Sequence, residues 1–322
     1  MESLERKIGF DIVRNITKGK CATASAVRLV EELPIMTDAE AIVKALSLTD
    51  EMRLICMFED TFPMDGYVDM KEFLCRLEAE SAMISLEELV HLQKGLQTVR
   101  RIVAFFSSSR EGTYPSLQEM DSPVILFPEV ARRIDSIVDK FGEIRDNASP
   151  ALAEIRRQLK EKEKSVAKTI AAIMRKAQAD GIVDPEASVV IRDGQTLLPV
   201  NSSDTRKLAG IVTDESASGK TSFIEPIEVV AIGNAIRELH FEQQREIIRI
   251  LVEFSDFLRP YLPELKNGAD FLVKVDFIRA KAQVALDMIA GMPLISQDGR
   301  MALRKARHPL LERSPKKEGK EI

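Results

Sequence analysis

The sequence has few of the residues that form disulfides and zinc sites. Its 322 residues include only three cysteines. Cys21, Cys56 and Cys75 are too few and too unevenly spaced to bind zinc. An odd cysteine count without a secretory segment is typical of reduced thiols in an intracellular protein, and we expect these three to be buried and structurally ordinary. No disulfide framework and no structural metal is predicted.

Histidines and long apolar runs are equally scarce. The three histidines, His91, His240 and His308, are scattered along the chain. This spacing favours solvated or capping roles over metal binding or base catalysis. No window approaches the roughly 18 apolar residues that a membrane helix needs. Residues 1–5 also lack the basic start of a signal peptide. We therefore expect a cytoplasmic protein that does not engage a membrane and has no catalytic group.

The chain also lacks an excess of positive charge. It carries 46 lysines and arginines against 51 aspartates and glutamates, which leaves a formal net charge of −5. No global cationic field therefore recruits nucleic acid, and any such binding must come from a local surface.

Most of the sequence has the apolar periodicity of helices. In the N-terminal third the pattern predicts helices over 4–32, after a Thr37–Asp38 cap, over 69–79 and over 86–106. Pro115, Pro123 and Pro128 mark a connector, after which helical periodicity resumes from 130 to 141. A break at Gly142 follows. This third is predicted to be a helical body.

The stretch 189–226 is the one part that favours β structure. Val189–Arg192 and Gln195–Val200 flank Asp193–Gly194, a pair that suits a type I′ hairpin turn. Pairing across this turn sets Arg192 opposite Gln195. A second hairpin is predicted over 211–225, with 216–220 at its tip. Because one hairpin is marginally stable in water, we expect the two to form one small sheet.

Two long helical patterns of similar length enclose this β stretch. Ser149 followed by Pro150 is a typical helix start, and the first pattern runs from there to about Asp180–Gly181. The second runs from about Ile227 to Phe257. Equal apolar seams joined by a compact insert favour an antiparallel pair. The predicted fold is mainly α: a helical core with two long antiparallel lever helices that carry a small β-hairpin clamp at their tip.

After these helices, a further helix is expected from Gly268 to Leu286. Residues 300–311 then resemble a strand edge that enters a loop, and the tail from Ser314 is polar and expected to be disordered. The predicted domain order is the first part of the core at 1–148, lever helix one at 149–181, the clamp at 182–226, lever helix two at 227–263, the second part of the core at 264–299, and the start of a truncated ATPase domain or a tail at 300–322.

Two apparent ligand motifs fail on closer inspection. Asp65, Asp69 and Glu72 fit late positions of a calcium-binding loop, but Thr61 and Pro63 stand where its first two acidic ligands belong. Gly219–Lys220–Thr221 imitates the end of a phosphate-binding loop. The glycine required five residues earlier is Asp214, and the tripeptide joins two strands instead of a strand and a helix. We predict no metal, nucleotide or other cofactor in this chain.

Several ordered motifs resemble the N-terminal part of MutS-two, the bacterial MutS paralogue with a C-terminal Smr domain. The clearest are Ser216–Gly219 followed by Phe223–Pro226, and later Arg307–Pro309; further matching segments are 142–150, 191–200, 275–281 and 306–311. The resemblance covers nearly the whole chain. It implies a MutS-like core, lever helices and a clamp, and a parent protein that is a dimeric ATPase with ATP and magnesium and with an Smr-type endonuclease domain. Those domains are missing here, so the chain resembles a fragment.

The resemblance implies a non-catalytic module that engages branched DNA, in a mismatch-repair-like or anti-recombination role, or ribosomal RNA on stalled ribosomes. The alternative is a helical scaffold whose arm tip docks a protein and binds no nucleic acid. Basic residues in the clamp are few and are outnumbered by acids, and most of the run 156–164 fits a solvated helix face. The candidate phosphate contacts are Arg192, Arg206, Lys207 and Lys220 in the clamp, followed by Lys160, Lys164 and Lys168 on the first lever helix.

Overall fold

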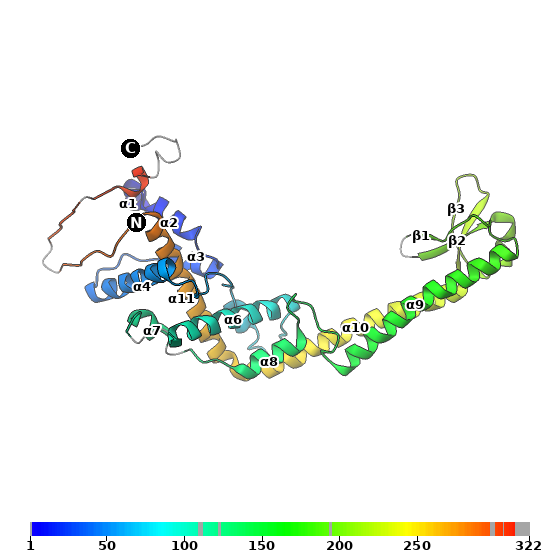
Figure 1. Ribbon diagram of the computed structural model, residues 1–322, viewed down its shortest axis with the longest axis horizontal. Helices are drawn as coiled ribbons and strands as arrows, with labels where there is room; N and C mark the ends of the chain where they lie inside the picture. Colours follow the sequence, from blue (N-terminus) through cyan, green and yellow to red (C-terminus); the bar gives the residue numbers. More distant parts are fainter. Residues whose placement is uncertain are drawn as a thin grey trace. The chain divides into compact units, whose positions relative to one another are not determined.

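A computed structural model (Figure 1) describes residues 2–108, 112–121, 124–192, 195–296, 300–304 and 306–312. The chain divides into two compact units. The first unit combines Met1–Asp135 with Phe254–Ile322, and the second is Ser136–Glu253. No helix among the described residues is long and apolar enough to cross a membrane.

The first unit is entirely helical in its described part. Its elements are α1 (Glu2–Ile8), α2 (Phe10–Lys18), α3 (Ala24–Glu31), α4 (Ala39–Phe58), α5 (Lys71–Arg76), α6 (Leu86–Ser108), α7 (Pro115–Asp121), most of α8 (Pro128–Ile137), the end of α10 (Ile227–Leu258), the short 3-10 turn η2 (Arg259–Tyr261) and α11 (Leu262–Asp287). Helix α11 packs against α2, α3, α4, α5 and α6, and Figure 1 shows it crossing the middle of these helices. Because neighbours surround it, α11 is apolar on most sides.

One polar contact fixes the start of α3 on α11. The Asp276 carboxylate is fully buried and accepts hydrogen bonds from the backbone amides of Ala22 and Thr23, at 2.9 and 2.8 Å. Arg279 donates to the same carboxylate at 2.6 Å and lies over the Tyr67 ring. A buried carboxylate is tolerated because these donors replace its lost hydration.

The helical body differs from the sequence prediction at three places. The pattern over 4–32 is broken twice, at Gly9, whose φ is 72°, and between α2 and α3. The predicted connector contains helix α7, which begins at Pro115, where a missing amide proton costs nothing. Helix α11 begins at Leu262 instead of Gly268, because a proline in the first turn is compatible with a helix.

Two further predictions were wrong. No strand is present in the described residues from 300 to 312; residues 309–312 form a helical turn. Alternation in a short segment cannot create a strand where no neighbouring strand is available to pair with it. The three cysteines are unpaired, as expected, but Cys21 and Cys56 are only half-buried and Cys75 is exposed.

In the second unit, helices α9 (Pro150–Ala179) and α10 contact each other at both ends. Ser149 caps α9 by accepting from the Leu152 amide at 3.0 Å, which confirms the predicted helix start. Its hydroxyl also lies 2.5 Å from the Glu246 carboxylate of α10. At the other end of α9, Met174 belongs to the same buried cluster as Val229 of α10. The two helices, of 30 and 32 residues, therefore run antiparallel within this unit.

A four-stranded antiparallel sheet lies between these helices in the sequence. Its strands are β1 (Val190–Arg192), β2 (Gln195–Asn201), β3 (Gly210–Glu215) and β4 (Thr221–Pro226), in the order β1-β2-β4-β3, with the 3-10 turn η1 (Ser202–Lys207) before β3. Both predicted hairpins and their union into one sheet are confirmed, including the pairing of Arg192 with Gln195. Residues 193–194 lie outside the described part of the chain.

The sheet packs on the end of the helix pair where α9 ends and α10 begins (Figure 1). Leu198, Val200 and Ile224 alternate along β2 and β4, and all three are buried against Ile170 and Met174 of α9. A period of two places Leu198 and Val200 on one face of β2, and Ile224 lies opposite Leu198 on β4. These two strands are the central ones of the sheet, whereas β1 and β3 are its edges. The chain is thus mainly helical with one small antiparallel sheet, as predicted.

Candidate nucleic-acid interface

Arg192 is already held by two neighbours in the sheet. Its guanidinium forms an ion pair with Asp214 of β3 and lies over the Phe223 ring of β4, 4.3 Å from the ring centroid. All three side chains come from three different strands, so sheet pairing brings them together. Because Asp214 neutralises this arginine, a phosphate could bind it only by displacing or adding to that pair.

Lys207 is neutralised in a similar way. It lies 2.7 Å from the Asp204 carboxylate, one turn earlier in η1. The hydrogen bond from Lys207 lowers the pKa of Asp204 below its usual range. The pair is exposed and therefore weak, but it still leaves little net charge at this position.

Arg206 and Lys220, by contrast, are exposed and have no side-chain partner among the described residues. Lys220 lies at the tip of the β3–β4 hairpin. There Gly219 has a φ of 68° and its amide donates to the Ser216 carbonyl at 2.7 Å. The tripeptide Gly219–Thr221 thus belongs to a hairpin turn, as the sequence indicated, and it opens no helix that could bind a nucleotide phosphate.

Helix α9 has a row of cations on one exposed side. Lys164, Lys168 and Arg175 are separated by four and seven residues, which places them on the same side of a helix of roughly 3.6 residues per turn. All three are exposed, and no acidic partner is present for them among the described residues. Arg175 was missed by the sequence prediction, although its spacing from Lys168 could have revealed it. We call these three residues the α9 cationic row.

At the start of α9, in contrast, the cations have acidic partners. Lys160 lies 3.3 Å from Asp146, which Arg156 also contacts at 2.5 Å. The hydrogen bond from Arg156 lowers the pKa of Asp146. Farther round the helix, Arg157 bridges Glu154 and Glu161 and lowers the pKa of Glu154 to about 2. At the start of α9, Arg156, Arg157 and Lys160 are therefore each paired with nearby acids on a solvated surface.

Neither unit has the side chains of a metal centre in its described residues. No group of three or more histidines, cysteines, aspartates and glutamates is close enough to hold an ion. The site candidates that remain are cations that can contact an anionic polymer, and the backbone of nucleic acid is the general partner for such groups.

The fold places the chain in the class of mainly helical proteins that contain one small antiparallel sheet. No protein-family model matches the chain. It does match curated proteins named endonuclease MutS2: 32% identity over 312 residues with that of Lacticaseibacillus paracasei, 33% over 312 residues with that of Ruminiclostridium cellulolyticum, and 33% over 311 residues with that of Streptococcus agalactiae serotype Ia.

Each of these alignments covers 97% of this chain and 39% of the relative. The chain is a homologue of MutS2 across this region, which confirms the resemblance seen in the sequence motifs. It spans about two fifths of the length of the curated relatives that it matches.

Proposed function

We propose that this chain is the non-catalytic core, lever and clamp module through which a MutS2 protein engages branched DNA or structured ribosomal RNA. In this proposal the first unit is the core, α9 and α10 are the levers and the four-stranded sheet is the clamp. The relatives are named endonucleases, enzymes that act on nucleic acid. That name supports a nucleic-acid partner for the module.

The α9 cationic row is the observation that carries the proposal. Lys164, Lys168 and Arg175 extend from one side of a rigid helix and have no acidic partner among the described residues. Cations spaced along a helix can follow a phosphate backbone, and each contact releases a counterion. Arg206 and Lys220 of the clamp add two further cations that have no side-chain partner among the residues that the structure describes. In contrast, the pairing of Arg192 with Asp214 and of Lys207 with Asp204 makes those two weaker candidates.

Salt-dependent binding tests this assignment. Fluorescence anisotropy would measure the affinity of the chain for a labelled four-way DNA junction and a labelled structured RNA, from about 50 to 200 mM salt. The variant Lys164→Ala/Lys168→Ala should weaken binding and reduce the salt slope by up to about one unit per lost phosphate contact. The substrate that loses more affinity identifies the preferred nucleic acid.

The same helix offers a matched control. Lys162 and Lys176 are exposed lysines of α9 that lie away from the cationic row. Lys162→Ala/Lys176→Ala removes the same charge and should leave both affinity and slope nearly unchanged. Equal losses in the two variants would indicate non-specific attraction, and no binding to either substrate at low salt would refute the proposal.

A second function is supported by exposed apolar residues of the sheet. Ile191, Ile211 and Val212 expose 75%, 49% and 48% of their surface, and all of edge strand β3 is exposed. An open edge strand can pair with a strand of another protein. This exposed edge supports the alternative in which the sheet docks another protein. The affinity for such a protein partner should change little with salt concentration.

The catalytic functions of the longer protein are part of the same proposal. We assign ATP hydrolysis with magnesium, strand cleavage by an Smr-type domain, and dimerisation to regions of the MutS2 relatives that this chain does not align with. The chain by itself is then expected to neither hydrolyse ATP nor cut nucleic acid.

A further inference from the structure

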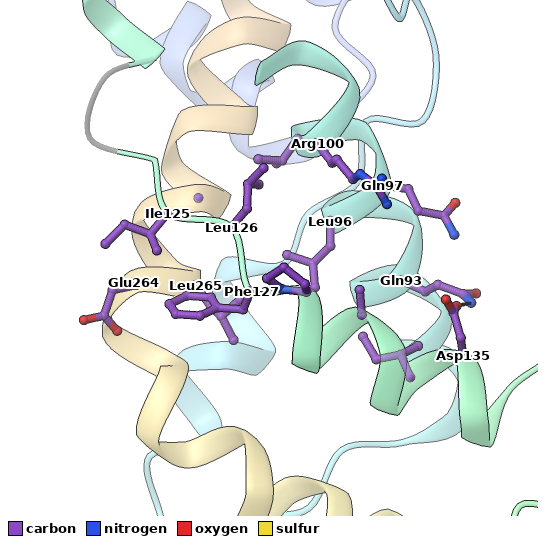
Figure 2. A pocket seen from close by; sticks show the side chains of 15 residues that line it. Gln93, Leu96, Gln97, Arg100, Ile125, Leu126, Phe127, Asp135, Glu264 and Leu265 are labelled. Atoms are coloured by element: carbon purple, nitrogen blue, oxygen red, sulfur yellow. Dashed lines mark hydrogen bonds between the residues drawn. The ribbon is translucent and has the colours of Figure 1, made fainter. Parts of the chain in front are cut away.

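A cavity of about 290 Å³ lies within the first unit (Figure 2). Its walls are α6, the segment before α8, α8 itself and the first turns of α11. Leu96, Ile134 and Leu265 contribute apolar surface, and Phe127 closes one side. The Phe127 ring packs edge-on against Tyr261, with 5.0 Å between centroids, so this wall is fixed by an aromatic contact.

Gly268 lines the cavity, and no packing contact requires glycine at this position. It is buried in α11, and a Cβ added to it would meet no atom within 4 Å. Glycine is less favourable than alanine inside a helix, because it loses more backbone freedom on folding. Any larger side chain here would enter the cavity. The glycine therefore keeps this space open at some cost in stability, which is expected when an occupant needs the space.

The rim of the cavity has one free positive charge. Arg100 lies beside Gln97 on the same side of the opening (Figure 2) and has no partner among the described residues. Unlike Arg100, the two acids at the rim do not offer a free charge to the cavity. Asp135 accepts a hydrogen bond from Gln93 at 2.8 Å. The Glu264 carboxylate points away from the cavity (Figure 2). An apolar space with an unpaired guanidinium at one end suits a molecule with an apolar body and an anionic group.

We propose that this cavity binds a small aromatic anion, with the rings between α6, α8 and α11 and the anionic group at Arg100. The volume of the cavity limits how many aromatic rings the ligand can have. An apolar cavity of about 150 Å³ holds one benzene ring, so a space of this size accommodates two fused rings. This site is independent of the nucleic-acid surface proposed for α9.

Calorimetry with two probes tests the proposal on the full chain. Naphthalenesulfonate carries the fused rings and the charge, and naphthalenesulfonamide is its neutral counterpart. We expect saturable binding of the sulfonate at one site. Arg100→Gln should weaken sulfonate binding about tenfold, as expected for the loss of a charge-assisted hydrogen bond, and should hardly affect the sulfonamide.

Filling the cavity provides the second part of the test. Gly268→Leu from α11, or Ala131→Leu from α8, should abolish binding of both probes. Two matched controls should bind like the unmodified chain: Arg101→Gln, whose guanidinium faces Asp65 at 3.4 Å, and Gly233→Leu, a helix glycine of α10 with equally open surroundings.

Circular dichroism confirms that each variant is folded before its binding is measured. The absence of saturable sulfonate binding by the unmodified chain would overturn the proposal. So would unchanged binding in a folded Gly268→Leu or Ala131→Leu variant. Equal weakening by Arg100→Gln and Arg101→Gln would remove the assigned anion contact.

Discussion

The carboxylate of Asp276 binds both the backbone amide and the hydroxyl of Thr23, at 2.8 and 2.9 Å, although 253 positions separate the two residues. Thr23 in turn caps α3 by accepting from the Ala26 amide at 3.1 Å. One buried acid thus orients the start of a helix from the other end of the chain. Arg279, itself 6% exposed, completes the group.

Removing this carboxylate should therefore destabilise the chain strongly. Asp276→Ala leaves Arg279 buried without its counter-charge, and we expect a loss of about 3–5 kcal/mol in the free energy of unfolding, measured by urea denaturation. Asp270→Ala is the control on the same helix. Its partner Lys71 lies 2.8 Å away in an exposed pair, and such pairs contribute about 0–1 kcal/mol. Similar losses in both variants would contradict a structural role for the buried group.

Two helix glycines should respond in opposite directions to alanine. Gly268→Ala places a methyl group in open space and should stabilise α11 by about 0.5–1 kcal/mol. Gly95→Ala in α6 places it 2.2 Å from the sulfur of Met70, which is 1% exposed and has little room to move. Overpacking of this kind costs about 1–3 kcal/mol. Thermal denaturation of both variants would check the prediction, and a stabilising Gly95→Ala would refute it.

Lys281 should make stability depend on pH in the alkaline range. Burial lowers the pKa of its amine to about 8, against about 10.4 in an unfolded chain. Below pH 8 the lysine is protonated in both states, so folding bears the full cost of burying its charge. Between the two pKa values the unfolded state binds more protons, and this cost declines as pH rises. The Phe277 ring, 4.5 Å from the amine, offsets part of it.

Lys281→Met should accordingly stabilise the chain at pH 7 by about 1–3 kcal/mol, an amount that shrinks towards pH 10. The comparison is made by urea denaturation of both proteins at each pH, so that contributions from other titrating groups cancel. A difference between the two proteins that stays constant from pH 7 to pH 10 would show that the amine does not titrate in this range.

The four cations of the clamp should differ in how much each contributes to nucleic-acid binding. Replacing Arg192, Arg206, Lys207 and Lys220 together by alanine should weaken binding to every nucleic acid sequence about equally. Most of this loss should come from Arg206→Ala/Lys220→Ala, because these side chains have no partner among the described residues. Arg192→Ala/Lys207→Ala removes the same charge from existing ion pairs and should have the smaller effect on the salt slope.

An unchanged affinity and slope in the folded quadruple variant would exclude the clamp from the binding surface. The α9 cationic row would then remain as the contact surface. A larger effect from the Arg192/Lys207 variant would instead indicate that the ion pairs open when nucleic acid binds.

Much of the second unit follows from local sequence. Ser149 and Pro150 start α9 because an N-cap hydroxyl and a proline in the first turn act within a few residues. The pairing of Arg192 with Gln195 follows from a two-residue loop, and the second hairpin from the glycine at its tip. Such signals need no knowledge of the rest of the chain, so the sequence alone determined the two long helices and the sheet.

Contacts between distant segments were decided only by the tertiary structure. No periodicity connects Asp276 to Thr23, and none shows that Asp214 neutralises Arg192 from another strand. Nor could the pattern around Gly268 reveal a cavity, because an empty space is defined by side chains from four separate elements. Charge and burial depend on neighbours in space. The sequence therefore predicted which residues were cationic, and the fold decided which of them remained free to bind a partner.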